Sequence, residues 1–160
     1  MAIKLNENSY VTLDQANAYF ADRTNAQAFL SLDNNAKEDL LITATRYLDD
    51  TNEYVGVAVS TSQPLAWPRT GTYYEPRYSN TVALPTSEVP DRLKRATYEM
   101  ALHLAENPDN LTSRTTLDKI KVGSIELSGL QSMSKVPSQV RSVVKPLLGY
   151  GSTSLPWRAW

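Results

Sequence analysis

The chain has no cysteine and a single histidine among its 160 residues. Without cysteine it can form no disulfide, no thiol nucleophile and no thiolate metal site. Its charges almost cancel: 16 basic and 17 acidic residues leave a formal net charge of −1, which supplies no overall field to attract nucleic acid. The first residues lack the apolar run of a signal peptide, and no stretch reaches the roughly 18 apolar residues of a membrane span. We therefore expect a soluble protein, and its length suits one domain.

Helical periodicity is clear in the first third of the chain. Thr12-Leu-Asp-Gln15 is a capping box, in which the threonine hydroxyl accepts from the amide of Gln15, and an apolar stripe follows it to about Asp22. Asp33-Asn34 can cap a second helix, whose apolar residues recur at the spacing of one buried face. This second helix is predicted to end near residues 50–52.

Two more helices are predicted in the second half, each opened by a proline. Ser87-Glu-Val-Pro90 begins the first of them, with proline at the first helical position, and Asn107-Pro108 ends it. Ser134-Lys-Val-Pro137 begins the second in the same way. Pro146 should end this last helix early, and Gly149 should close it. The predicted fold class is a mainly α domain of about four helices.

Two segments between these helices lack helical periodicity. Residues 52–89 contain Trp67 and several tyrosines, whose apolar surface argues against disorder. We predict a long ordered loop with room for a short hairpin, and connections of this length are often functional. Residues 117–130 are predicted to form a β-hairpin with a two-residue turn at Gly123-Ser124 and one aliphatic face. A lone hairpin is marginally stable, so it should pack on the helices or on a neighbouring subunit.

Few residues could carry catalysis or hold a metal ion. His103 lies beside the apolar stripe of its predicted helix, and a histidine at the edge of the core, without a chemical role, is the favoured interpretation. Asp49, Asp50 and Glu53 come nearest to a cation site, but they lack the alternating ligands and glycine of a calcium loop, which favours a solvated helix end. We expect no enzyme activity, no cofactor and no metal.

Residues 67–78 interleave aromatic and basic side chains. Single-stranded nucleic-acid sites use this mixture, because bases stack on rings while arginine meets phosphate. The alternative is a long loop held to its own domain by its rings, which the near-zero net charge favours. For Trp67, between Pro64 and Pro68, we rank burial in the core first, contact with a neighbouring subunit second and a stacked base third. The members of the segment are Trp67, Arg69, Tyr73, Tyr74, Arg77 and Tyr78.

Several stretches resemble, in this order, a family of small tailed-phage proteins. The second and third stretches contain AT-x-x-LD and Q-x-L-x-WPR, which are fairly specific together and weak alone. The family often carries the label of a DnaT-like single-stranded-DNA-binding protein, yet it is similar to helical head–tail connector proteins, also called adaptor or head-completion proteins. The stretches are Tyr10-Val-Thr-Leu-Asp-Gln-Ala-Asn-Ala-Tyr-Phe20, Leu41-Ile-Thr-Ala-Thr-Arg-Tyr-Leu-Asp49, Gln63-Pro-Leu-Ala-Trp-Pro-Arg69, Val89-Pro90 with the alanine-rich helix to Ala105, and Lys121-Val-Gly-Ser-Ile125.

The connector resemblance implies a structural virion protein. Copies would form a ring, commonly a dodecamer, beneath the portal protein in the neck of the virion. The ring would extend the DNA channel and present a platform to the tail or to a second neck (stopper) protein. Genomic DNA would pass through without sequence-specific binding, and the chain, made in the host cytoplasm, would touch no membrane. The DnaT-like label implies the alternative, a single-stranded-DNA-binding protein that uses residues 67–78.

Residues 1–151 are expected to form the helical connector-like domain, and residues 152–160 a C-terminal docking arm. Glycine and serine lead into this arm, and Pro156 keeps it extended. Tryptophan and arginine are frequent at the energetic centres of interfaces, and we expect the portal as the arm's partner. The candidate interface residues are Trp157, Arg158, Trp160 and Arg69, and Trp67 is the candidate that holds the long loop to the domain.

Overall fold

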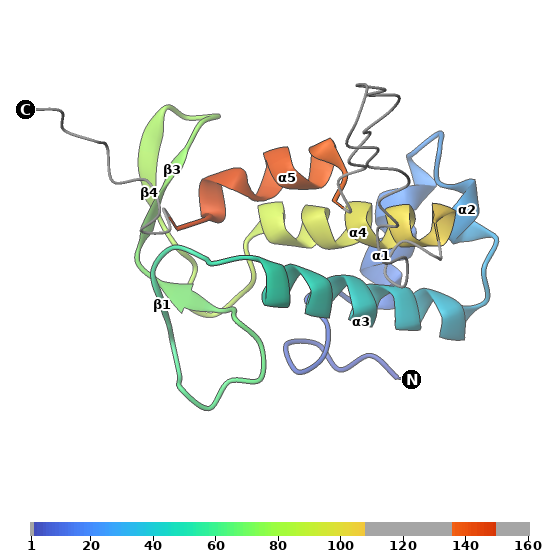
Figure 1. The fold of residues 1–160 in the computed structure, drawn as a ribbon, viewed down its shortest axis with the longest axis horizontal. Helices are drawn as coiled ribbons and strands as arrows, with labels where there is room; N and C mark the ends of the chain where they lie inside the picture. The colour runs from blue at the N-terminus through green and yellow to red at the C-terminus, as the bar shows by residue number, and fades with distance from the viewer. Residues whose placement is uncertain (1, 108–135, 150–160) are drawn as a thin grey trace, which may run out of the picture.

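The computed structural model describes residues 2–107 and 136–149 of the chain (Figure 1). Three helices, α3, α4 and α5, lie side by side, and two shorter ones, α1 and α2, sit at the end where α3 begins (Figure 1). The predicted mainly α class is confirmed, and within the described ranges no helix is long and apolar enough to cross a membrane. The helices are α1 (Leu13–Ala21), α2 (Gln27–Leu30), α3 (Asn34–Thr51), α4 (Asp91–Glu106) and α5 (Ser138–Val144), followed by a 3-10 turn, Lys145–Leu147.

Side-chain caps start the two helices that the sequence locates best. The amide of Gln15 donates to the Thr12 hydroxyl over 3.2 Å, and the Gln15 side chain accepts from the amide of Thr12 over 3.0 Å. This confirms the capping box at the start of α1. Asp33 caps α3 by accepting from the amide of Ala36 over 2.7 Å.

The prolines that precede α4 and α5 stand one position earlier than predicted. Pro90 and Pro137 are N-cap residues with ψ near 142° and 145°, which is extended backbone, so α4 begins at Asp91 and α5 at Ser138. The proline's locked φ suits either position, and ψ, which the sequence does not reveal, decides between them. The prediction of proline at the first helical position is therefore wrong by one residue. Pro146 does end α5 early, within the 3-10 turn.

The segment between α3 and α4, residues 52–89, is called the insertion below. It is ordered and holds two small antiparallel sheets in place of a structureless loop. At their junction Gly56 and Gly71 have φ of 74° and 136°, and a Cβ on Gly56 would lie 2.3 Å from the carbonyl oxygen of Thr70. Only glycine fits that close approach. The strands are β1 (Val57–Ala58) paired with β2 (Arg69–Thr70), and β3 (Thr72–Glu75) paired with β4 (Asn80–Ala83).

Trp67 is the largest fully buried side chain of the described residues. Its ring meets that of Tyr54 edge to face, with centroids 5.5 Å apart and planes at 72°. Both rings belong to the core that also contains Leu48 of α3 and Leu93 of α4, so the insertion shares one apolar core with the helices. The predicted hairpin at 117–130 and the predicted arm at 152–160 lie outside the described residues.

We expect Trp67→Ala to lower the free energy of unfolding by about 3–5 kcal/mol, the usual range for removing a large buried ring. Trp67→Phe should lose less, because it keeps a ring and because the indole Nε1 has no hydrogen-bond partner in the described part of the chain. Tyr74→Ala, which removes a 56 % exposed ring of the same insertion, is the matched control and should change little. Urea unfolding measures the stability of all three variants. An unfolding midpoint of Trp67→Ala equal to that of the wild type would show that Trp67 does not stabilise the core.

Candidate functional site

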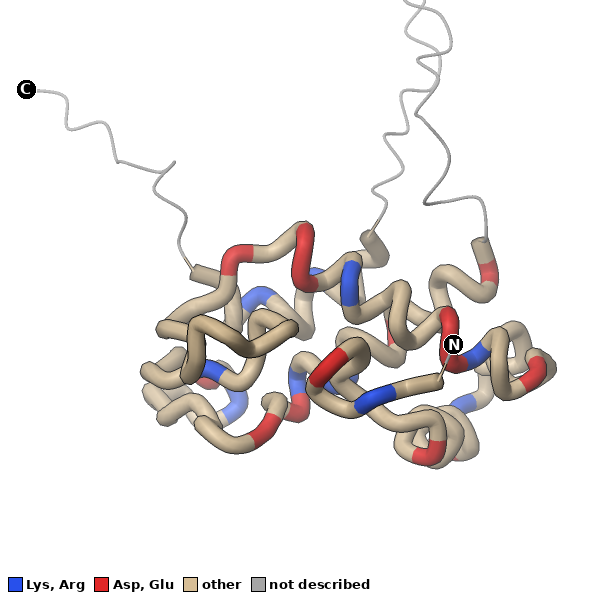
Figure 2. Tube along the Cα trace, turned by 90° about the horizontal axis from the view of Figure 1, so that it is seen from below, with Lys and Arg blue, Asp and Glu red and all other residues tan. Residues whose placement is uncertain are grey.

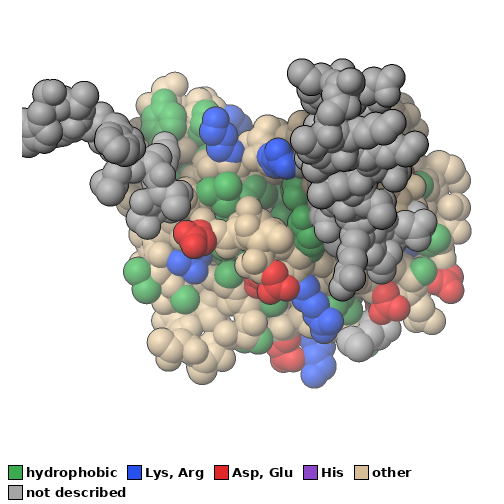
Figure 3. Space-filling view, in the orientation of Figure 1, with side chains coloured by type: hydrophobic (Ala, Val, Ile, Leu, Met, Phe, Trp, Pro, Cys, Tyr) green, Lys and Arg blue, Asp and Glu red, His purple; other side chains and the backbone are tan. Residues whose placement is uncertain are grey.

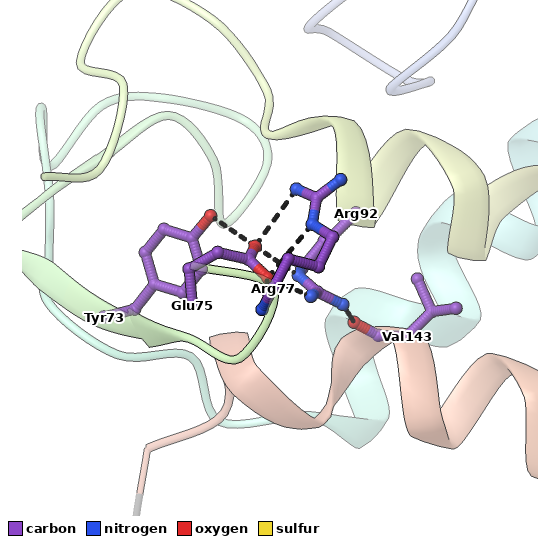
Figure 4. A network of polar contacts seen from close by, with 5 residues as sticks. All are labelled: Tyr73, Glu75, Arg77, Arg92 and Val143. Atoms are coloured by element: carbon purple, nitrogen blue, oxygen red, sulfur yellow. Dashed lines mark hydrogen bonds and ion pairs between the residues drawn. The ribbon is translucent and has the colours of Figure 1, made fainter. Parts of the chain in front are cut away.

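A buried carboxylate, Glu75, lies at the centre of a polar network that joins the insertion to the helices (Figure 4). Its side chain is 0 % exposed. From the start of α4, the Arg92 guanidinium makes a two-pronged contact with it: Nε donates to Oε2 over 2.7 Å, and NH2 donates to Oε1. The NH1 group of Arg92 also donates to the carbonyl oxygen of Val143 over 3.5 Å. Glu75 thereby connects β3, α4 and α5.

Two groups from the insertion itself complete the coordination of this carboxylate. Arg77 donates its backbone amide and Nε to Oε1 and its NH2 to Oε2, each over 3.1 Å. The hydroxyl of Tyr73 donates to Oε2 over 3.1 Å. Hydrogen bonds from Arg92, and then from Arg77, hold the pKa of Glu75 far below its usual range despite burial. At neutral pH the network therefore contains an ionised carboxylate between two arginines.

Arg69 serves the insertion in a different way, by binding backbone carbonyls. Its Nε donates to the carbonyl oxygen of Val55 over 2.8 Å, and its NH2 donates to that of Gly56 over 2.7 Å. Longer bonds reach the carbonyl oxygens of Tyr54, 3.3 Å from NH2, and Ala66, 3.2 Å from NH1. A planar guanidinium with several fixed donors is suited to joining two chain segments in this manner. Arg69 ties residues 54–56 to the segment that carries Trp67.

Asp49 is not the solvated helix end that the sequence suggests. It accepts a hydrogen bond from the hydroxyl of Tyr10 and another from the amide of Ala66, the latter over 2.9 Å. Burial raises the pKa of the Asp49 carboxyl, and burial together with the nearby Asp49 charge raises that of Tyr10. Asp49 therefore connects the N-terminal segment, α3 and the insertion.

The outer side of the insertion leaves large side chains in water. Tyr74 and Tyr78 are 56 % and 68 % exposed, and Val57 and Val59 on the other sheet are 68 % and 50 % exposed. The guanidinium of Arg77 lies 5.5 Å from the ring centroid of Tyr78. These exposed side chains all belong to one ordered segment, and exposed apolar surface on an ordered segment can serve as a contact surface.

A second uncovered apolar surface lies between α3 and α5. It is a groove of about 550 Å³, and Figure 3 shows hydrophobic side chains gathered between these helices with charged side chains at the margins. The residues that line it are Leu48, Thr51, Asn52, Val136, Ser138, Val140, Arg141, Ser142, Val144, Lys145 and Leu148. Grooves of this size and composition usually bind apolar groups.

The structure describes some of the candidate residues that the sequence analysis names and leaves others outside the described ranges. Trp67 is buried and Arg69 is bonded within its own chain, while Trp157, Arg158 and Trp160 lie outside the described residues. His103 stands on α4, with its Nδ1 3.4 Å from the side-chain Nδ2 of Asn107. Among the described residues no three His, Cys, Asp or Glu side chains are placed to hold a metal ion.

Sequence reasoning missed the two residues that matter most to the site, Glu75 and Arg92. They are 17 positions apart and belong to different elements, so no local spacing pairs them. One signal was present: Glu75 is an acidic residue inside the aromatic-basic segment 67–78, and a charged side chain needs a partner wherever the fold buries it.

Basic and acidic residues are interspersed along the described chain, without a continuous basic stripe (Figure 2).

Comparison with known proteins identifies one family. Residues 2–159 match a family model described as "Putative DnaT-like ssDNA binding protein". No curated protein and no solved structure matches the chain. The matched range spans nearly the whole sequence, so the likeness is not confined to the segment 67–78.

We expect Glu75→Gln to lower the free energy of unfolding at pH 7 by about 3–5 kcal/mol, because it leaves Arg92 without its counter-charge. The loss of stability should lie toward the lower end of this range, because the second arginine, Arg77, is half-exposed and water screens its uncompensated charge. The exposed Glu88→Gln, which contacts Lys94 at 3.7 Å, is the control and should cost at most about 1 kcal/mol.

The same variant should reveal the titration of Glu75. Because its folded pKa is depressed, its stabilisation is complete above the unfolded value of about 4.3 and is lost as pH falls below that value toward the folded one. The gap between wild type and Glu75→Gln should therefore narrow between pH 5 and pH 2 in denaturant titrations. A gap that stays constant over this range would mean that the charge of Glu75 is not what stabilises the fold.

Proposed function

This chain belongs to the family described as putative DnaT-like ssDNA-binding proteins, and we propose that it acts as a head–tail connector, an adaptor in the neck of a tailed phage. Copies would form a ring beneath the portal protein, commonly of twelve, extend the DNA channel and offer a platform to the tail or a stopper protein. The proposal starts from the connector resemblance of residues 10–20, 41–49 and 63–69.

The observation that carries the proposal is the uncovered apolar surface on an otherwise well-packed domain. The exposed side chains of Val57, Val59, Tyr74 and Tyr78 project from the insertion, and the α3–α5 groove lies beside it. A single copy of the described domain covers neither surface. An assembly protein needs such surfaces and needs them on rigid elements, and the bonds made by Arg69 and Glu75 supply that rigidity.

The charges of the insertion also suit assembly better than attraction of DNA. Arg69 is committed to four backbone carbonyls and Arg92 to Glu75. Glu75 also neutralises much of the charge of Arg77. With basic and acidic residues interspersed (Figure 2), the part of the surface made by residues 2–107 and 136–149 lacks the basic groove that tracks a nucleic-acid backbone. DNA could then pass through a ring of such chains without strong binding.

A chain truncated after Gly151 tests the connector proposal. It should melt like the full chain, because we expect residues 152–160 to be a docking arm outside the core. It should nevertheless fail to co-sediment with portal-bearing capsids and leave heads without tails. The full-length double variant Trp157→Ala/Trp160→Ala, which keeps the length of the arm, should fail in the same assay. Undiminished co-sedimentation of both variants would show that the arm does not join the neck.

Single-strand binding is the second candidate, and the family description favours it. The only surface of the insertion that suits it is the pair of exposed rings, Tyr74 and Tyr78, with Arg77 beside the second. Rings in water can stack on bases, and an arginine next to them can meet a phosphate. Trp67, the strongest stacking side chain of the segment, is buried and takes no part.

Titration of fluorescent oligo-dT at several salt concentrations separates the two functions. For a connector we expect weak or no binding at physiological salt. Micromolar or tighter affinity with a steep salt dependence, lost in Tyr74→Ala/Tyr78→Ala but kept in Val57→Ala, would favour the single-strand-binding function instead. Val57→Ala is the matched control, since it removes an equally exposed side chain from the neighbouring sheet.

A further inference from the structure

We propose that the α3–α5 groove of one copy receives residues 155–160 of a neighbouring copy. This inference rests on the proposed ring and names its contact: the partner of the arm is a second copy of this chain. The groove would bind the side chains of Leu155, Trp157 and Trp160, and each copy would both donate an arm and accept one.

The groove has the chemistry of a site for apolar side chains. Its lining includes the buried Leu48 of α3 and the buried Val140 and Val144 of α5, together with Val136 and Leu148, which precede and follow α5 in the chain. The exposed Arg141 and Lys145 line one margin. The volume of this groove, about 550 Å³, lies within the range of roughly 300–1,000 Å³ that is typical of ligand pockets in proteins.

The path of the chain leads away from its own groove. After the 3-10 turn, the amide of Val55 donates to the carbonyl oxygen of Leu147 over 2.9 Å, and the amide of Gly149 donates to that of Glu53 over 2.8 Å. Tyr54 and Leu148 form an antiparallel bridge between these bonds. Gly149 is thus fixed beside the insertion, past the end of the groove at which Leu148 lies, and Figure 1 shows α5 running toward this exit. An arm would have to reverse its direction to enter the groove of its own copy.

The sequence beyond Gly149 has the reach and composition for a neighbouring groove. Eight residues lead from Gly149 to Trp157, which can span roughly 26–29 Å when extended. Leu155, Trp157 and Trp160 contribute the apolar side chains of residues 150–160 that the groove would bind. Tryptophan is the side chain most often found at the energetic centre of an interface, in a pocket that excludes water.

Such a contact is directional and therefore suits a ring. An arm on one side of the domain and a groove on another make a head-to-tail interface, which closes into a ring when the rotation between copies divides the circle. Each added copy contributes one arm–groove contact, and closure adds one more without recruiting another copy, which favours the closed ring. The contact accounts for the face of α5 that residues 2–107 and 136–149 of a single copy leave uncovered.

Photo-cross-linking of the full chain tests the inference. A benzophenone amino acid replaces Trp157 in isotopically light chain, which is mixed with heavy chain at about 1 mM, a concentration comparable to that within a closed assembly. After illumination, mass spectrometry identifies the cross-linked residues and whether they join light to heavy chain. We expect light–heavy cross-links to residues 136–148 and to the end of α3.

Every other pattern overturns the inference. Cross-links to the groove that join only light to light would mean that the arm covers its own copy. Cross-links to other surfaces, or none at all at this concentration, would exclude the groove as the site. If cross-links form only when portal protein is added, and if they join the arm to the portal protein, the partner of the arm is the portal.

A variant of the groove provides the matched control. Ser142 lines the groove and is exposed, and its hydroxyl donates to the carbonyl oxygen of Gln139 over 2.9 Å, so Ser142→Arg should fill the groove without disturbing the core. Ser142→Arg should lower the yield of light–heavy cross-links by about tenfold. Asn35→Arg introduces the same side chain at an exposed position near the other end of α3 and should leave the yield unchanged. Equal yields in the two variants would exclude the groove.

Electron microscopy of the chain with portal protein reports separately on the proposed function. Rings that form on the portal while the cross-links avoid the groove would refute only the arm–groove contact. Absence of rings together with absence of cross-links would refute both.

Discussion

The contact between Glu75 and Arg92 is the constraint on which the arrangement of the domain depends. It places an ionised carboxylate from the insertion against the first turn of α4, and Arg92 extends the contact to the backbone of α5. Removing a charged pair from water is expensive unless the remaining donors and acceptors are satisfied. Here Arg77 and Tyr73 complete the coordination, so the cost of burial is offset and the insertion has one position relative to the helices.

The rest of the insertion follows from this position. Trp67 is drawn into the core beside Tyr54. Asp49 accepts from the backbone amide of the preceding Ala66, and Arg69 donates to the carbonyl oxygens of residues 54–56. Backbone groups of residues 54–56 and 66, which a long connection must satisfy, are therefore satisfied by side chains of the same chain. One consequence is functional: Arg69 and Arg92 are already bound within the chain, whereas the large side chains of Val57, Tyr74 and Tyr78 remain exposed to a partner.

These features reconcile two views of the family. Its description refers to single-stranded DNA, and an interleaved aromatic and basic segment is a reasonable ground for that expectation. In the folded chain the segment holds the insertion to the helices, and of its aromatic and basic side chains only Tyr74, Arg77 and Tyr78 are exposed. The uncovered α3–α5 groove and the exposed sheet surfaces are the features that a ring-forming structural protein would use.

Local chemistry in the sequence determined much of the helical framework. Capping by Thr12 and Asp33, the apolar spacing of α3 and α4, and the stop at Pro146 involve residues within a turn or two of one another, so the pattern alone predicts them. Two local details still escaped: the four-residue α2 is too short to show a period, and ψ placed Pro90 outside α4. Tertiary structure alone decided the site. Glu75 meets Arg92 across 17 positions and Asp49 meets Ala66 across the same number, and the groove exists only because α3 and α5 both pack on α4 and leave a space between them. Such contacts depend on the path of the chain in space, which no spacing rule contains.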